Sequence, residues 1–209
     1  MTCSPYQQTG VIRGNSGGPA PFSTATKHSA IRAPHFTIIC AGVAQESAPE
    51  FRLATALQRR LDSLGCVVNC LVFPDPSETT LPQNSAGVVV IAPESVADDV
   101  CAAVSGTPGF SGNGRPFATI VPGTSPSAAA KRQKIRETLL TLGLLCAEEE
   151  GTNSLFEDWD LTEAADDHVF HGAGFMQEIS NTAAILMLAA SEYSSPSPLA
   201  ENHSNQLLK

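Results

Sequence analysis

The chain has 209 residues, of which 42% are hydrophobic, and carries a formal net charge of −9 at pH 7. That length suits one well-buried core. No Lys or Arg occurs from residue 137 to 208, and eleven acidic residues lie between 148 and 192, which argues against a nucleic-acid partner. No apolar run approaches the ~20 residues of a membrane span and no charged-then-apolar leader opens the chain, so we expect a cytoplasmic protein with no membrane partner.

The first 34 residues are rich in Gly, Ser, Pro, Thr and Gln, and they show no periodic apolar pattern. We therefore predict a disordered N-terminal extension over residues 1–34, and a disordered polar tail over residues 194–209. A single folded domain is predicted between them, over residues 35–193.

Within that domain, strand patterns alternate with helix patterns. We predict strands at residues 36–40, 66–73, 87–92, 116–121 and 144–147, and helices at residues 49–64, 96–104, 127–142 and 174–193. The run at 88–92 is apolar throughout, as is typical of a central strand that has helices on both sides. The sequence therefore predicts an α/β fold, a five-stranded parallel sheet with helices on both faces in three layers. Its size favours a flavodoxin-like arrangement.

Six cysteines occur, four of them in apolar, strand-like runs where a free thiol behaves as a small hydrophobe. Cys66 and Cys70 fall on the same face of one predicted strand, too far apart along it for an easy disulfide. We interpret the cysteines as reduced core residues of a cytosolic protein.

Ligands of open α/β sheets bind where the carboxyl ends of the strands meet their loops, so three loops carry the functional prediction. Their sequences are GVAQESAPEFRLA at residues 42–54, APESV at 92–96, and IVPGTS at 120–125, the last followed by LLTLGLL at 139–145. In length, order and endings these strings resemble the NADPH-dependent FMN reductase family of flavodoxin-like proteins. The resemblance covers residues 36–193.

The resemblance implies an FMN-dependent oxidoreductase that transfers hydride from NAD(P)H through the flavin to a small-molecule acceptor. It also implies a homodimer or homotetramer. Carried over by position, the phosphate-binding residues are Gln45 and Ser47. One edge of the flavin ring is then bordered by Pro93, Glu94, Ser95 and Val96, and the other by Gly123, Thr124 and Ser125. No catalytic acid or base is assigned.

Several of these positions depart from the family pattern. Val43 and Gln45 replace its Ser and Arg, while Ser95 and Val96 replace its Tyr and Asn. An alternative hypothesis is therefore a flavodoxin-like domain that no longer binds FMN and acts as a partner or regulatory protein, or that catalyses another reaction in the same crevice.

Each loop also has a purely structural interpretation. Ser47 and Glu50 fit a capping box, in which the Ser side chain occupies amide donors that a phosphate would otherwise use. Ser95 could cap the next helix, and the loop containing Ser125 could be an ordinary turn with a Ser cap. Both interpretations of each loop stay open at this point.

Two charged clusters receive structural interpretations. Four basic residues within six positions, Lys131, Arg132, Lys134 and Arg136, are interpreted as a solvated helix face. His168 and His171 lie one helical turn apart beside two carboxylates. Ligands at that spacing can share a metal, but no second cluster supports a site, and we assign no metal.

Overall fold

Five parallel strands form the central sheet, in the order β2-β1-β3-β4-β5. The computed structural model describes residues 33–43, 45, 47–147, 156 and 167–194, and every statement below refers to these. The strands are β1 His35–Ala41, β2 Val67–Phe73, β3 Gly87–Ile91, β4 Pro116–Ile120 and β5 Leu145–Cys146. The predicted parallel sheet is confirmed, with each strand within two residues of its expected bounds. The predicted extension and tail lie almost entirely outside the described residues.

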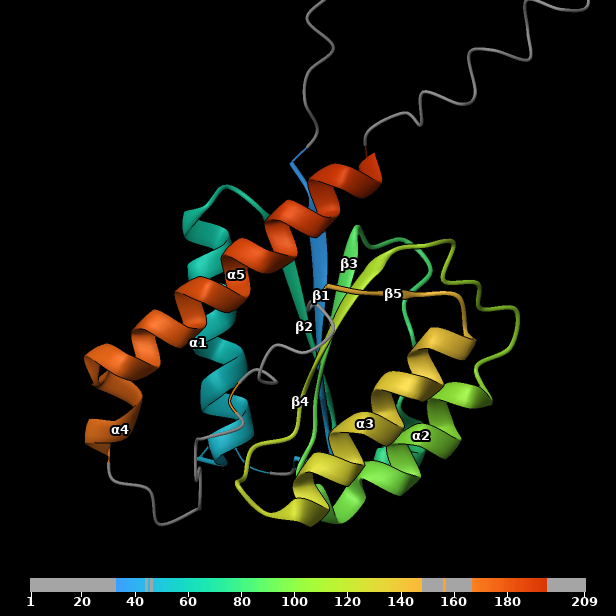
Figure 1. Ribbon diagram of the computed structural model, residues 1–209, viewed down its shortest axis with the longest axis horizontal. Helices are drawn as coiled ribbons and strands as arrows, with labels where there is room; N and C mark the ends of the chain where they lie inside the picture. Colours follow the sequence, from blue (N-terminus) through green and yellow to red (C-terminus); the bar gives the residue numbers. More distant parts are fainter. Residues whose placement is uncertain (1–32, 44, 46, 148–155, 157–166, 195–209) are drawn as a thin grey trace, which may run out of the picture. The chain divides into compact units, whose positions relative to one another are not determined.

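Helices cover both faces of this sheet, as predicted (Figure 1). The helices are α1 Pro49–Ser63, α2 Ala97–Ser105, α3 Pro126–Thr141, α4 Asp167–His171 and α5 Ala173–Ser194, and the 3-10 turns are η1 Pro76–Glu78 and η2 Glu94–Val96. Helices α1 and α5 pack on one face and α2 and α3 on the other, so two separate apolar clusters flank the sheet. None of the described helices is both long and apolar enough to cross a membrane.

The apolar patterns of the sequence correspond to these two clusters. All five residues of β3 are buried, because helices cover it on both sides. Leu53, Leu57 and Leu61 of α1 are fully buried against the sheet, whereas Leu64 follows the end of the helix and is 41% exposed. The apolar stripe of α5 packs in the same cluster, as expected for a core helix.

Strand β2 lacks this two-sided cover. The connection from β2 to β3 contains only the short turn η1, so within the described residues no α-helix follows β2 before the chain enters β3. Val67 and Leu71 are 53% and 36% exposed as a result. The Pro-rich segment between β2 and β3 therefore forms a loop around this one short turn.

The described cysteines all carry free thiols. Cys66 and Cys70 both contact the cluster beneath α1 and α5, which confirms their shared face. A hydrogen bond with the Cys70 thiol, together with burial, raises the pKa of Cys40 well above its ordinary value. Cys40 is therefore a neutral core thiol rather than a nucleophile.

The strand order creates one topological switch point, between β1 and β3. From β1 the chain passes through α1 on one face to β2, and from β3 it passes to α2 on the opposite face. The two connections therefore separate at the carboxyl ends of these neighbouring strands, and in open α/β sheets this separation forms a ligand crevice.

Candidate functional site

The three predicted loops meet at the carboxyl edge of the sheet. They follow β1, β3 and β4, which are hydrogen-bonded neighbours in that order (Figure 1). The first two loops touch, because a Cβ built on Gly42 would lie 2.6 Å from Cγ2 of Val96. The second and third are joined by a hydrogen bond in which Ser125 Oγ donates to Glu94 Oε2 over 3.0 Å. The structure therefore brings the predicted site residues to one edge.

The first loop begins with a tight turn at Gly42, where φ is +72°. Its amide donates to the carbonyl of Phe73 at the end of β2, over 2.7 Å. Further on, the Ala48 amide donates to the Gln45 carbonyl over 3.1 Å, and Ser47 Oγ donates to Gln45 Oε1 over 3.3 Å. Both predicted phosphate residues are thus exposed neighbours in one turn. Residues 44 and 46 lie outside the described residues.

The capping-box interpretation of Ser47 and Glu50 is wrong. The N-cap is Ala48, and no side chain accepts a hydrogen bond there. The turn from Gln45 to Ala48 places Ser47 one residue ahead of the cap, and its hydroxyl bonds to Gln45 instead. Pro49 occupies the first helical position, where its missing N–H costs nothing. Among the described residues, no side chain caps the first turn of α1.

The second loop also differs from expectation. The N-cap of α2 is Val96 rather than Ser95, and no side chain caps it, because residues 94–96 form the 3-10 turn η2 ahead of the helix. Ser95 is exposed at this turn. Pro93 begins the turn in an extended conformation, and Val96 closes it against Gly42.

The third loop ends at the N-cap of α3, which fixes its last residues. Ser125 is the N-cap of α3 and accepts a hydrogen bond from the Ala128 amide over 2.9 Å, which confirms the Ser-cap interpretation. Hydrogen bonds from Ser127 and Ser125 lower the pKa of Glu94, so this carboxylate is charged at neutral pH. Thr124 is exposed beside them.

Arg132 is the residue that sequence reasoning missed. It was expected on a solvated face, but its side chain is buried, with 3% of the residue exposed. One guanidinium nitrogen, Nη1, donates to the carbonyls of Val121 (2.6 Å) and Gly123 (3.1 Å), so α3 holds the backbone of the loop that precedes it. The single available signal was position, since Arg132 lies three and seven residues before the buried Ile135 and Leu139.

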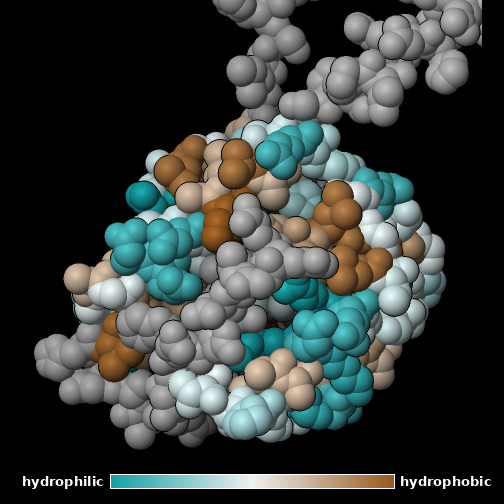
Figure 2. Space-filling model, viewed as in Figure 1, coloured by the Kyte–Doolittle hydropathy of each residue, from teal (hydrophilic) through white to brown (hydrophobic). Residues whose placement is uncertain are grey.

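The rest of the basic cluster lies at the surface, which is largely hydrophilic over α3 (Figure 2). Lys131 and Lys134 both pair with Asp98 of α2, the second over 2.7 Å. These hydrogen bonds lower the pKa of Asp98 to about 2. The two lysines therefore join α3 to α2 rather than form a binding patch.

The histidine pair is only partly described. Asp166 and the side chain of His168 lie outside the described residues. Among the residues that are described, no three His, Cys, Asp or Glu side chains are placed to hold a metal ion. His171 is exposed at the end of α4 and lines a hollow next to α1.

Comparison with known proteins gives the fold. No protein-family model matches the chain, and no curated protein sequence matches it. Among solved structures, the flavoenzyme NAD(P)H:(acceptor) oxidoreductase FerB from Paracoccus denitrificans is similar, with a TM-score of 0.54 and 12% identity over 77% of this chain and 99% of that one.

Two further structures are similar at lower scores. One is a short-chain flavodoxin associated with a non-canonical PDU bacterial microcompartment, with a TM-score of 0.48 and 12% identity over 75% of this chain and 99% of that one. The other is an oxidoreductase from Corynebacterium diphtheriae, with a TM-score of 0.49 and 16% identity over 77% of this chain and 98% of that one. With its strand order and its likeness to FerB, the chain has a flavodoxin-like fold.

Proposed function

We propose that this protein binds FMN in the crevice between the β1 and β3 loops and acts as an NAD(P)H-dependent oxidoreductase on a small-molecule acceptor. The observation that carries this proposal is the start of α1, which lies at the switch point and which no described side chain caps. Helix starts with unoccupied amide donors are suited to phosphate groups. The similar fold of a flavoenzyme NAD(P)H:(acceptor) oxidoreductase supports the same assignment.

The donors at this helix start fit a phosphate group. The amides of the first helical turn, together with the positive end of the helix dipole, favour an anion. The side chains of Gln45 and Ser47 are exposed at the same turn and add an amide and a hydroxyl donor. Glu50 lies in the first turn and is 9% exposed. Its carboxylate opposes a second negative charge, so we expect weaker FMN binding than an arginine-containing loop would give.

The other two loops would border the flavin ring. Backbone groups of Glu94 and Ser95 would lie along one edge, with Pro93 and Val96 shaping that side. Gly123 and Thr124 would lie along the other, in a loop that Arg132 and Ser125 already hold in place. When bound, the flavin supplies the hydride-transfer chemistry. The protein's own contribution would be to bind and orient it.

A second candidate function rests on two contacts at the same edge. The hydroxyl of Ser125 is bonded to Glu94, and Val96 packs against Gly42 where the family pattern has Asn. Both contacts occupy groups that the resemblance assigns to the flavin. They favour a domain that keeps the fold but uses the crevice for a partner or another reaction.

The experiment that separates the two candidates is an FMN titration of the purified full chain, followed by flavin fluorescence and absorbance. Binding at or below about 100 μM FMN, a free energy of about −5.5 kcal/mol, supports the first candidate. Gln45→Arg should then tighten binding about tenfold, because an arginine forms charge-assisted hydrogen bonds with phosphate.

The matched control is Gln133→Arg, which adds the same charge on the exposed surface of α3. We expect it to change FMN affinity less than twofold. A chain that takes up no FMN at that concentration, even with Arg at position 45, contradicts the flavin proposal and favours the second candidate.

A further inference from the structure

Strand β2 is an edge of the sheet, and β1 is the one described strand that pairs with it. The amide of Val67 and the carbonyl of Phe73 both bond to the β1 side, over 2.9 and 2.7 Å. Backbone groups of alternate residues point in opposite directions along a strand, so the groups of the even-numbered residues point away from the sheet. These residues are Val68, Cys70 and Val72, and within the described chain their outward backbone groups have no partner.

This edge lacks the features that usually keep the edge of a sheet from pairing. Such features are a very short strand, a charged residue, a proline, a bulge or a covering element. Strand β2 spans seven residues, VVNCLVF, without charge or proline, and its register with β1 is continuous over all seven. The opposite edge strand, β5, has two residues. Of the two edges, β2 is therefore the one suited to accept another strand.

Apolar side chains flank the open backbone of β2 on both faces of the sheet. Val67 and Val72 point to opposite faces and are 53% and 39% exposed. Val68 and Cys70 pack against the cluster beneath α1, whereas no described α-helix covers the other face of β2. An added strand would therefore remove apolar surface from water as well as bond to the backbone.

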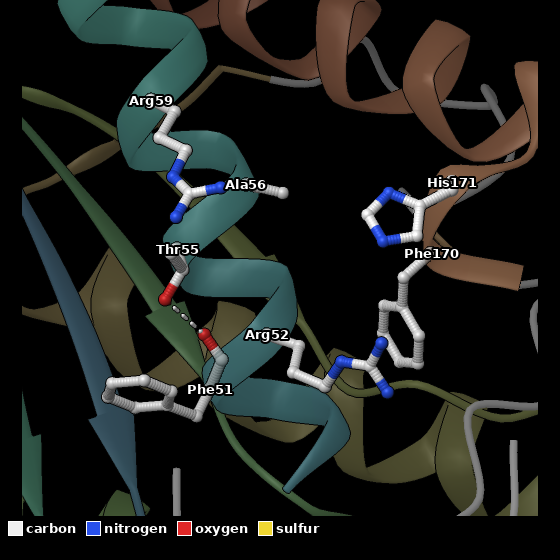
Figure 3. A pocket seen from close by; sticks show the side chains of 7 residues that line it. All are labelled: Phe51, Arg52, Thr55, Ala56, Arg59, Phe170 and His171. Atoms are coloured by element: carbon white, nitrogen blue, oxygen red, sulfur yellow. Dashed lines mark hydrogen bonds between the residues drawn. The ribbon is translucent and has the colours of Figure 1, made fainter. Parts of the chain in front are cut away.

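Charge also distinguishes this edge from the hollow of about 270 Å³ between α1 and α4. That hollow is lined in part by Arg52, Arg59 and His171, and the guanidinium carbon of Arg52 lies 3.8 Å from the centre of the Phe170 ring (Figure 3). Burial of charged groups is costly unless each gains a partner, and β2 has no charged residue. Two copies of a chain with a formal net charge of −9 can therefore meet at β2 without burying charge in the strand.

The open backbone groups of β2 are symmetric about Cys70. On one side of Val68, the amide of Cys66 already bonds within its own chain, over 3.2 Å. On the other side of Val72, Pro74 has no N–H to donate. In an antiparallel pair with a two-fold axis at Cys70, this residue bonds to its own copy, and Val68 bonds to Val72 of the second copy. Each pair exchanges two hydrogen bonds, so every outward group of these three residues finds a partner.

The same register matches the side chains on the uncovered face. Val67 lies opposite Phe73 of the second copy, and Asn69 lies opposite Leu71. Directly opposed apolar residues stabilise an antiparallel pair, and no like charges are opposed here. The strand is therefore complementary to itself in backbone and in side chains.

We propose that β2 is a docking edge for a second copy of this chain, which adds its own β2 in antiparallel orientation and joins the two sheets into one. The contact is isologous and leaves no edge of β2 open, so it closes at a dimer. It does not depend on the proposed flavin function. Two seven-residue strands cover a small interface, so we expect a dissociation constant of about 1–100 μM.

The test is sedimentation velocity of the full chain under reducing conditions, over about 1–500 μM, where a monomer–dimer equilibrium is expected. Val72→Pro removes an outward donor but no bond to β1, a position at which an edge strand tolerates proline. It should weaken the dimer at least tenfold, because each copy loses one hydrogen bond. Leu71→Lys adds a charge to the uncovered face and should also weaken it at least tenfold.

The matched control is Leu145→Lys, which adds the same charge to the other edge strand, at a residue that is 59% exposed. It should change the dissociation constant less than twofold. Far-ultraviolet circular dichroism shows whether each variant is folded. Because Leu71 is already partly exposed, Leu71→Lys keeps the test valid even if Val72→Pro does not fold.

A cross-linking experiment tests the register. Asn69 and the opposed Leu71 form a non-hydrogen-bonded pair, in which Cα atoms lie about 4.5 Å apart, within the range of a disulfide. We expect a mixture of Asn69→Cys and Leu71→Cys chains, treated with oxidised glutathione, to give a peptide that links positions 69 and 71. Mass spectrometry should find several times less linkage at either position when each variant is oxidised alone.

Three outcomes would overturn the proposal. One is a chain that stays monomeric over the whole concentration range. Another is a dimer that Val72→Pro and Leu71→Lys leave unchanged, or that Leu145→Lys weakens equally, because the contact would then lie elsewhere or respond to net charge alone. The third is no more cross-linking in the mixture than in the separate variants, which would exclude the two-fold axis at Cys70.

Discussion

Helices α1 and α3 begin at the same edge of the sheet, each after a buried parallel strand and each with Pro in the first turn. Their starts differ in how the backbone is satisfied. At α3, Ser125 caps the helix and Arg132 binds two carbonyls of the preceding loop. At α1, the cap is Ala48 and no side chain takes part. Side chains therefore fix the start of α3, whereas no described side chain caps the start of α1, where we propose that the amide donors bind a ligand.

Arg132 provides the strongest test of the α3 half of this comparison. Arg132→Met keeps much of the buried stem but leaves two loop carbonyls without their donor. We expect a loss of about 2–4 kcal/mol in the free energy of unfolding, measured by urea denaturation. The control Arg136→Met, also on α3 but half-buried, should lose less than about 0.5 kcal/mol. Equal losses would show that the buried guanidinium does not hold the loop.

Gly42 tests how firmly the α1 side of the crevice is shaped. Gly42→Ala should cost about 2 kcal/mol or more, because φ is +72° and the new Cβ would lie 2.6 Å from Val96. Gly65→Ala has a similar φ of +83° but open space around it, so it should cost only about 1 kcal/mol. Adding Val96→Ala should restore about half of the Gly42→Ala loss. If Val96→Ala restores no stability, the loss in Gly42→Ala does not come from a clash between the loops after β1 and β3.

The two serines near the helix starts compare the ends directly. Ser125→Ala removes the side-chain cap of α3 and should lower the free energy of unfolding by about 1 kcal/mol. Ser47→Ala removes only an exposed bond to Gln45 and should cost less than about 0.3 kcal/mol. In FMN titrations we expect the reverse order, with Ser47→Ala the more damaging. If Ser125→Ala is the more damaging variant in both assays, the start of α1 has no special role in binding FMN.

The smallest effect concerns the surface pairing of α2 with α3. Asp98 has a pKa of about 2 in the folded protein, below its usual value of 3.8, because Lys131 and Lys134 donate to it. Because the pKa of Asp98 is lower in the folded protein than in the unfolded chain, the ionised carboxylate stabilises the fold at pH values above the unfolded pKa. This stabilisation is lost as the pH falls from about 4 through about 2. Asp98→Asn should flatten the stability curve in that window. An unchanged acid limb would assign acid sensitivity to other carboxylates.

Much of the architecture could be predicted because it depends on local patterns. The apolar run of β3 required cover on both faces, and the leucines of α1 required one buried stripe. Alternation of the two patterns then left few arrangements other than a doubly wound parallel sheet. The three loops followed from that topology, because parallel strands present their carboxyl ends at one edge.

The details of those loops could not be predicted, because contacts between distant segments decide them. Ser47 matched a capping pattern, but the turn at Gln45 moved the cap to Ala48. Arg132 carried the residue type of a surface helix, yet its buried guanidinium found carbonyl acceptors nine and eleven residues earlier in the chain. Residue types and spacing specify which segments become strands and helices. Which polar groups are satisfied by the protein, and which stay open for a ligand, depends on where folding brings their partners.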